Sequence, residues 1–181
     1  MENFMPVLAN IFGICAVALF VISYQMKSRR AIIALGAASR ILYVTQYILL
    51  GAFEGALLDI VAFFVSILCG QTERGFIKKH FAAAIVLSNV AIVGVGMLAY
   101  RNIFSLLPIF GVIFETLALW LKKEKHIRLV SLLGAPFWMA FNIKSGAYGS
   151  VVGNVITLGS LAVAILRYDI LKKEKKEKQE A

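Results

Sequence analysis

The sequence predicts an all-α membrane protein with seven transmembrane helices. The mean hydropathy of its 181 residues is +0.83, 60% of them are apolar and only 16% are charged. A chain of this size cannot bury so much apolar surface in one water-soluble core. The apolar residues also gather in several runs, close to the length of about 20 residues that an α-helix needs to cross roughly 30 Å of hydrocarbon.

Short polar breaks divide these runs into the expected helices. The first run follows MENF, which lacks a basic segment, and no small-residue cleavage site follows it, so we expect it to stay in the membrane. Only GAFE separates the second run from the third. Pro108 falls near the start of the fifth run, where a proline is tolerated, whereas Gly134 and Pro136 fall inside the sixth. The expected helices cover residues 5–25, 31–51, 54–70, 81–99, 102–121, 127–144 and 147–167.

Lysines and arginines predict the orientation of these helices. Sixteen of the 19 fall in four segments that lie on one side of the membrane if the helices number seven. Arg101 and Lys144 lie on the other side, and Arg40 lies within a helix. This asymmetry predicts a cytoplasmic C-terminus and an N-terminus outside, and it explains the net charge of +9 without a nucleic acid partner. The four segments are 26–30, 71–80, 122–128 and 167–178.

Two short motifs recur at a long spacing. The motif IFG occurs at 11–13 and again at 109–111, and GAF at 51–53 recurs as GAY at 146–148. The second spacing, 95 residues, aligns Asp59 with Asn154. Self-similarity over a long period marks the building block of a fold. The two spacings differ by three residues, which a shorter loop would absorb, so each copy is expected to span three helices.

Two such units joined by one helix form a 3+1+3 arrangement. The odd joining helix, FAAAIVLSNVAIVGVGMLAY, makes both units insert in the same direction, as parallel repeats about an axis along the membrane normal. The expected divisions are a first three-helix unit at 1–70, a linker with the inverter helix at 71–101, a second three-helix unit at 102–168 and a charged cytoplasmic tail at 169–181.

The cleft between two repeats is where transporters hold their solute, and Asp59 and Asn154 are expected to face each other across it. Each lies about one and a half turns below the turn that starts the third helix of its unit. Alternatively, each side chain only hydrogen-bonds a neighbouring helix, as polar groups in membranes often do. An unpaired carboxylate is costly in hydrocarbon, which favours a functional role for Asp59.

Arg40 is expected near the bilayer centre, where inserting an arginine costs about 2.5 to 3.5 kcal/mol, so it needs a partner or a wet cavity. Arg40, Tyr43 and Tyr47 share one helical face because they are spaced i, i+3, i+7. The repeat aligns Tyr43 with Trp138 and Tyr47 with Asn142, so both second helices carry an aromatic and polar stripe. The predicted substrate-binding residues are Tyr43, Asp59, Trp138, Asn142 and Asn154.

Three further residues are assigned to gating or coupling. Counting about 1.5 Å per residue, Glu115 of the fifth helix lies at a depth similar to that of Arg40, so the two are expected to meet as an ion pair between the units. Such a pair either locks the units together or breaks and re-forms as they rock, and Glu115 is also a candidate to take up a proton. Pro136 removes a backbone hydrogen bond, which produces either a hinge or a static kink.

The sequence contains no pattern typical of catalytic or cofactor chemistry. Cys15 and Cys69 lie at different expected depths, so they support neither a disulfide nor a metal pair, and no CxxC motif occurs. His80 and His126 are expected in loops. Glycine-rich phosphate loops, serine nucleophile elbows and HExxH motifs are absent. We therefore expect no enzyme, no catalytic residue, no metal and no cofactor.

Four segments resemble the YgjV-type bacterial inner membrane proteins, over residues 8–167. They are LANIFGICAVALFVISYQMKSRR, YILLGAFEGALLDIV, LLPIFGVIFETLALW and FWMAFNIKSGAYGSVVGN. That family is distantly similar to the PQ-loop, SWEET and PnuC proteins, which share a 3+1+3 arrangement. The resemblance implies a bacterial inner membrane location and a transporter-like fold.

The resemblance to SWEET-like transporters also bears on the site. In those proteins, asparagines on the third helix of each unit and a tryptophan on the later second helix shape a sugar site. Asn154 and Trp138 match those places, whereas Asp59 puts an acid where the pattern has an amide. This departure favours a cationic or donor-rich solute, or proton coupling, over a neutral sugar.

The expected function is that of a small-solute transporter or facilitator whose two units rock about a central site. Its expected partners are the lipid bilayer and a small polar solute, with a homo-oligomer left open. The rival functions are a membrane receptor or sorting protein and a scaffold that binds no ligand. A transporter predicts a water-accessible cavity from one face to Asp59, whereas a scaffold predicts apolar side chains packed there.

Overall fold

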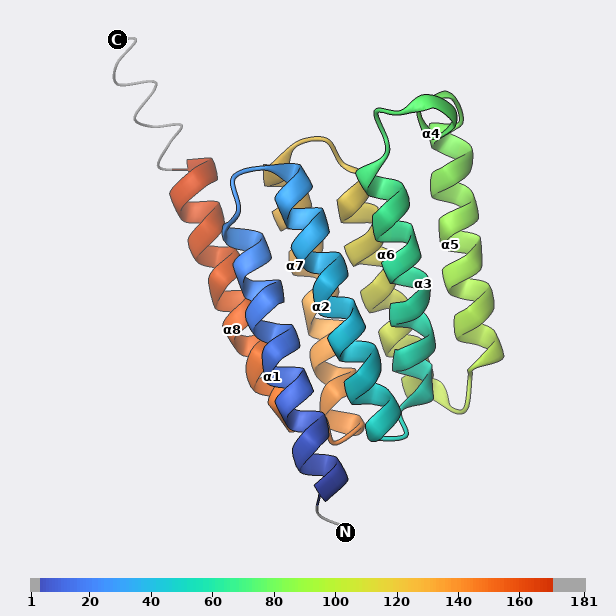
Figure 1. The fold of residues 1–181 in the computed structure, drawn as a ribbon, viewed down its shortest axis with the longest axis vertical. Coiled ribbons are helices and arrows are strands. Elements are labelled where there is room, and N and C mark those ends of the chain that lie inside the picture. The colour runs from blue at the N-terminus through green and yellow to red at the C-terminus, as the bar shows by residue number, and fades with distance from the viewer. Residues whose placement is uncertain (1–3, 171–181) are drawn as a thin grey trace.

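The computed structural model describes residues 4–170, whose regular structure is entirely helical (Figure 1). Short helical pieces accompany the long helices: α4 (Gly75–Lys79), the 3-10 turn η1 (Ile103–Ser105) before α6, and the π-helical segment η2 (Ile165–Ile170) after α8. The expected charged tail lies outside the described residues from 171 onward. The long helices are α1 (Phe4–Gln25), α2 (Arg29–Leu49), α3 (Phe53–Gly70), α5 (Phe81–Leu98), α6 (Leu106–Trp120), α7 (Glu124–Lys144) and α8 (Tyr148–Ala164).

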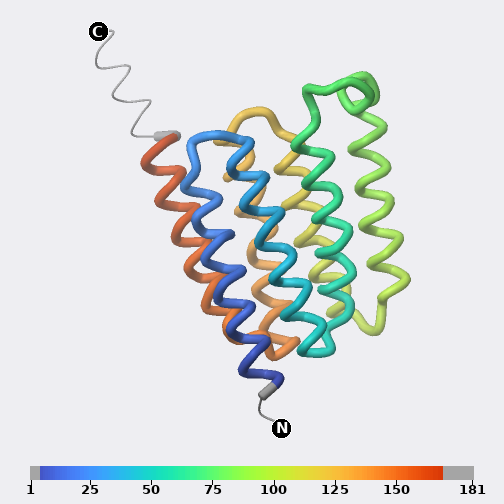
Figure 2. Tube along the Cα trace, viewed as in Figure 1, coloured from blue at the N-terminus to red at the C-terminus, as the bar shows by residue number. Residues whose placement is uncertain are grey.

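Six helical stretches of the described chain are long and apolar enough to cross a membrane, which confirms an all-helical multi-pass protein. The predicted count was seven. The stretch that falls short is α7, which is 21 residues long but carries charges near both ends, at Glu124, Lys125, Arg128 and Lys144. Even so, α7 runs within the bundle alongside α6 and α8 (Figure 2).

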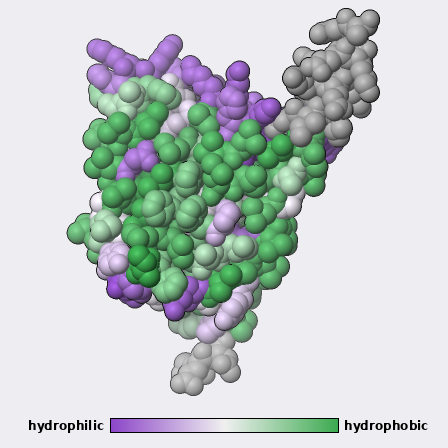
Figure 3. All heavy atoms as spheres, turned by 180° about the vertical axis from the view of Figure 1, so that it is seen from behind, coloured by the Kyte–Doolittle hydropathy of each residue, from purple (hydrophilic) through white to green (hydrophobic). Residues whose placement is uncertain are grey.

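Six of the long helices form a ring in the order α1, α2, α3, α6, α7, α8, and α8 packs back against α1. α5 lies outside the ring, against α3 and α6. On the face shown in Figure 3, the surface of the bundle is mostly apolar along its middle, and polar side chains gather at both ends. An apolar band between two polar ends matches the hydrocarbon and headgroup layers of a bilayer.

The turns after α2 and α7 have the same local structure. Gly51 and Gly146 have positive φ angles of 68° and 70°, which glycine adopts without the penalty of a Cβ. In each turn the glycine N–H donates to the carbonyl three residues back, at Ile48 or Ile143. The next alanine N–H donates to the carbonyl five residues back. These bonds form the Schellman motif, which ends a helix and reverses the chain, so the repeated GA-aromatic motif encodes two equivalent helix connections.

The repeated IFG motif places a glycine where two helices pack closely. A Cβ added at Gly13 of α1 would overlap the Gln46 side chain of α2, and one at Gly111 of α6 would lie 2.8 Å from Cδ1 of Trp138 in α7. Each glycine therefore leaves space for a side chain of the following helix. At Gly111, that space positions an indole at the centre of the ring.

Glycines of α8 supply a matched pair for testing this close packing. A Cβ at Gly153 would overlap the side chain of Val17 in α1, whereas nothing lies within 4 Å of a Cβ at Gly159. We expect Gly153→Ala to destabilise the protein by about 1 to 3 kcal/mol, because α1 and α8 must separate. Gly159→Ala is expected to be neutral or to stabilise by up to about 1 kcal/mol through helix propensity.

Buried Cys69 allows both variants to be measured in detergent. Its side chain is fully buried, so a thiol-reactive dye reports unfolding once the exposed Cys15 has been replaced by serine. Equal unfolding temperatures for the two glycine variants would contradict the close α1–α8 contact.

Candidate functional site

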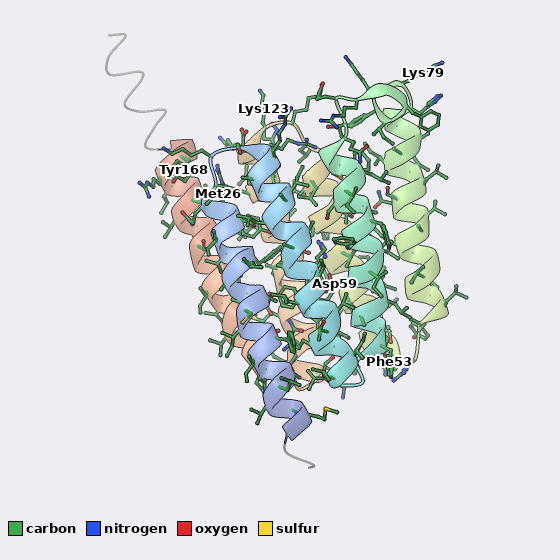
Figure 4. The ribbon with its side chains drawn as sticks, viewed as in Figure 1. Met26, Phe53, Asp59, Lys79, Lys123 and Tyr168 are labelled. Carbon is green, nitrogen blue, oxygen red and sulfur yellow. The ribbon has the colours of Figure 1, made fainter. Side chains whose placement is uncertain are left out.

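A buried arginine joins two carboxylates near the middle of the bundle. Arg40 of α2 donates through Nη1 to Asp59 Oδ1 of α3 at 2.5 Å, and through Nη2 to Glu115 Oε2 of α6 at 2.9 Å. The exposed fractions of the three residues are 3%, 3% and 7%. Asp59 lies about halfway between the two ends of the bundle (Figure 4). We call these three residues the charged triad.

The charged triad has an excess of one negative charge when all three groups are ionised. Charges removed from water are retained only where they are paired, and here one guanidinium serves two carboxylates. The residues that line the adjoining cavities include no second basic side chain within the described chain. The centre of the bundle is thus electrostatically suited to a cation.

Aromatic rings from both second helices stack beside the charged triad. Tyr43 stacks on Tyr47 with ring centroids 6.2 Å apart, and Tyr47 stacks on Trp138 at 6.0 Å. The hydroxyl of Tyr47 donates to Asn142 Oδ1 at 2.7 Å, and Asn142 Nδ2 donates to Asn154 Oδ1 at 2.8 Å. These contacts connect α2, α7 and α8 through one polar network, which holds each amide in a defined orientation.

The charged triad and this network surround one small cavity. Its volume is about 20 Å³, enough for roughly one water molecule. Every helix of the ring contributes to its wall, which consists of Phe20, Arg40, Tyr43, Tyr47, Asp59, Glu115, Trp138, Asn142 and Asn154. We call it the central cavity. The central cavity matches neither the open cavity expected of a transporter nor the apolar packing expected of a scaffold. Its wall is polar, but its volume is far too small for a solute.

The five residues predicted to bind a solute all line the central cavity, as do Arg40 and Glu115. The expected contact between Arg40 and Glu115 is present, whereas Pro136 lies inside α7 and is not part of the lining. Sequence reasoning missed Phe20 and the contact between Arg40 and Asp59. The latter had a signal, since the two residues stand at comparable distances on either side of the tight turn at Gly51.

Arginine side chains link helices across the ring at the end of the bundle that carries Lys79 and Lys123, which we call the basic end (Figure 4). Arg29 of α2 donates to the carbonyls of Leu119 and Leu121 at the end of α6, at 2.6 and 2.9 Å. Arg128 of α7 reaches back across the ring and donates to the carbonyls of Tyr24 and Met26 around the end of α1, at 3.4 and 3.3 Å. The last carbonyls of a helix have no partner within it, so these guanidiniums satisfy them across the ring.

The other end of the ring is closed by aromatic packing. Phe141 packs edge-on against both Tyr47 and Trp138, with ring centroids 5.8 and 6.0 Å apart. Beyond Phe141 lies a pocket of about 230 Å³ whose rim includes Glu54 and Arg101. Phe141 and the Tyr47–Asn142 hydrogen bond therefore separate this outer pocket from the central cavity.

Comparison with known protein families identifies the chain. The sequence profile of the YgjV family, described as bacterial inner membrane protein, matches residues 7–172, so the chain belongs to this family. Together with its membrane-spanning helices, this makes it a multi-pass protein of the bacterial inner membrane. No curated protein and no solved structure matched the chain.

Proposed function

We propose that this member of the YgjV family is a small-solute transporter or facilitator, in which two three-helix units rock about the central cavity. The observation that carries the proposal is the charged triad, which is buried at mid-depth and held by helices of both units. Ionisable groups are expensive inside a membrane and are found chiefly on ion or solute pathways. The proposal includes no enzymatic step and no cofactor.

The pairing of helices supports two parallel units, α1–α3 and α6–α8, with α5 as the joining helix. If the units are exchanged, the α1–α2 and α2–α3 contacts map onto α6–α7 and α7–α8, and the α3–α6 contact maps onto α8–α1. The matching Schellman turns at Gly51 and Gly146 support the same relation. In this arrangement α7 is the seventh span, with its charged ends at the two interfaces.

An odd number of spans places the two ends of the chain on opposite sides. The end of the bundle that carries Lys79 and Lys123 then faces the cytoplasm, as the positive-inside rule favours (Figure 4). The outer pocket beside Glu54 and Arg101 faces the periplasm, and the N-terminus lies on that side.

Alternating access requires one closure to open at a time. We assign the inner closure to the hydrogen bonds of Arg29 and Arg128, which join helix ends of opposite units. The outer closure consists of Phe141 and the Tyr47–Asn142 hydrogen bond. With both closures made, the central cavity has room for about one water molecule, which is the geometry expected of an empty conformation closed on both sides.

The rival functions are a receptor or sorting protein and a ligand-free scaffold of the same fold. A scaffold gains little from the charged triad, because replacing a buried ion pair by apolar residues of similar volume is often neutral or stabilising. The presence of three buried ionisable side chains around a cavity favours transport.

Accessibility of α8 tests the proposal without a known solute. In a background with Cys15→Ser and Cys69→Ser, rocking of the units is expected to expose Asn154→Cys to a membrane-impermeant thiol reagent applied to proteoliposomes. Val155→Cys is the control, because Val155 is 59% exposed on the outer surface and stays in lipid. Flux of radiolabelled metabolite pools into the same proteoliposomes then identifies the solute class. A correctly folded protein with neither labelling at 154 nor flux would favour the scaffold.

A further inference from the structure

We propose that an anionic phospholipid binds in a groove between α2 and α3 at the basic end of the bundle. Its acyl chain would lie between the two helices, and its phosphate would contact Arg30 and Arg74. This site is separate from the central cavity, and the inference does not depend on transport.

The groove has a volume of about 590 Å³ and a wall of small and aliphatic side chains. Ala34 and Ala37 of α2 and Gly70 of α3 are among its lining residues, and these small residues leave space that larger side chains would fill. The groove opens to the outside of the ring, where the surrounding solvent is lipid. An acyl chain is therefore the natural occupant of its apolar part.

The end of the groove nearest the basic loops is lined by polar and charged side chains. Arg29 is engaged there, because it donates to helix carbonyls and to Thr72 Oγ1 at 3.3 Å. Arg30 and Arg74, in contrast, are exposed, and their side chains make no hydrogen bond or ion pair within residues 4–170. Glu73 also lines the groove, but its carboxylate lies 4.0 Å from Lys122 Nζ, which offsets part of its charge.

Two unengaged guanidiniums above an apolar groove match an anionic phospholipid. Arginine binds phosphate with paired N–H donors, and each basic residue near a membrane adds attraction for anionic lipid. A second groove, of about 480 Å³ between α3 and α5, fits less well. Its polar lining is limited to His80 and Ser88, although Lys78 and Lys79 lie on the neighbouring α4.

The test measures lipid binding to the purified full chain by native mass spectrometry. The probes are phosphatidylglycerol and phosphatidylcholine with identical acyl chains. We expect one phosphatidylglycerol to bind about tenfold more tightly than phosphatidylcholine, and the variant Arg30→Gln/Arg74→Gln to lose this preference. The control Lys78→Gln/Lys79→Gln removes the same charge from the same end of the bundle but outside the groove, so it is expected to keep the preference.

A second pair of variants tests the apolar part of the groove. Ala34 and Ala82 are both exposed, but only Ala34 lines the groove. Ala34→Phe is expected to fill it and to weaken phosphatidylglycerol binding at least about fivefold by steric exclusion, whereas Ala82→Phe is expected to have no effect.

Two results would overturn the lipid site. If the lysine variant loses as much preference as the arginine variant, the attraction is diffuse. The second result is that inorganic phosphate competes fully with phosphatidylglycerol and that Ala34→Phe still binds phosphatidylglycerol normally. In that case the arginines bind a free anion and the groove plays no part. Should the arginine variant fail to fold, the alanine pair decides the question alone.

Discussion

Arg40→Ala is expected to destabilise the protein by about 3 to 5 kcal/mol, more than any other single truncation in the ring. The substitution leaves Asp59 and Glu115 buried with no counter-charge, and the cavity lining supplies no other basic group. The measurement is the temperature at which buried Cys69 becomes reactive in detergent, in a Cys15→Ser background.

Matched variants separate charge from size. Arg30→Ala removes the same side chain from the exposed start of the same helix and is expected to change stability by no more than about 0.5 kcal/mol. The triple variant Arg40→Met, Asp59→Asn, Glu115→Gln removes every charge at similar volume, so it is expected to recover most of the loss. A triple variant no more stable than Arg40→Ala would show that the buried charge is not the cause.

Coupling between Arg40 and Glu115 gives an independent check. The double variant Arg40→Ala/Glu115→Ala is expected to be more stable than the sum of the single effects implies, because the attraction between the two side chains is lost only once and, without Arg40, removing Glu115 lowers the buried negative charge from two to one. Full additivity of the two single effects would contradict the contact seen between the two side chains.

The helices were predictable because each apolar run nearly equals one bilayer crossing. The expected boundaries lie within a few residues of the observed ones, and the predicted start of the fifth helix at 102 coincides with the cap of η1 before α6. Hydropathy did not predict α4, which is five residues long and has an exposed, basic last turn. Short interfacial helices lack the length that makes an apolar run recognisable.

The residues that line the central cavity were predictable from two sequence patterns. Most of the contacts between these residues were not. The repeat aligned Tyr43 with Trp138 and Tyr47 with Asn142, and all four line the cavity. Depth counted along each helix brought Arg40 to the level of Glu115. The same count, taken from the turn at Gly51, could have brought Asp59 to that level as well. Depth does not give the rotation of a helix about its axis, however, so the hydrogen bond between Tyr47 and Asn142 could not be predicted from it.

The volume of the central cavity also could not be predicted from the sequence. A polar stripe on each second helix indicates that side chains converge, but the remaining volume depends on rotamers and on the distance between helices. Here the glycine at 111 brings Trp138 close to α6, and the stacked rings occupy the space that an open site would offer.

If the protein transports small solutes as proposed, neutralising one carboxylate is expected to change which of them cross the membrane. If the charged triad holds an excess negative charge, the wild-type protein favours small monocations over neutral molecules of the same size. Asp59→Asn keeps an oxygen acceptor for Arg40 but brings the net charge of the triad to zero. The measurement is uptake of labelled ethanolamine, a monocation at neutral pH, and of neutral ethylene glycol into proteoliposomes.

The expected fall in cation uptake follows from the lost attraction between the charged triad and the cation. Two unit charges about 4 Å apart interact by roughly 4 kcal/mol at an effective dielectric constant near 20, and desolvation of the solute offsets most of that. We expect Asp59→Asn to lower ethanolamine uptake by at least about tenfold, a change of about 1.4 kcal/mol. Ethylene glycol uptake is expected to stay within about twofold, since no charge attracts that solute.

Glu115→Gln provides the second member of the series, because it leaves the same net charge through the other carboxylate. It is expected to reproduce the selectivity change, and Asn154→Asp, which adds an acid to the cavity wall, is expected to strengthen the preference for the cation. If Asp59→Asn and Glu115→Gln lower the uptake of both solutes equally, the triad acts as a lock between the units and does not select charge. Because the two carboxylates come from different units, a shared effect on charge selection would place the solute between them.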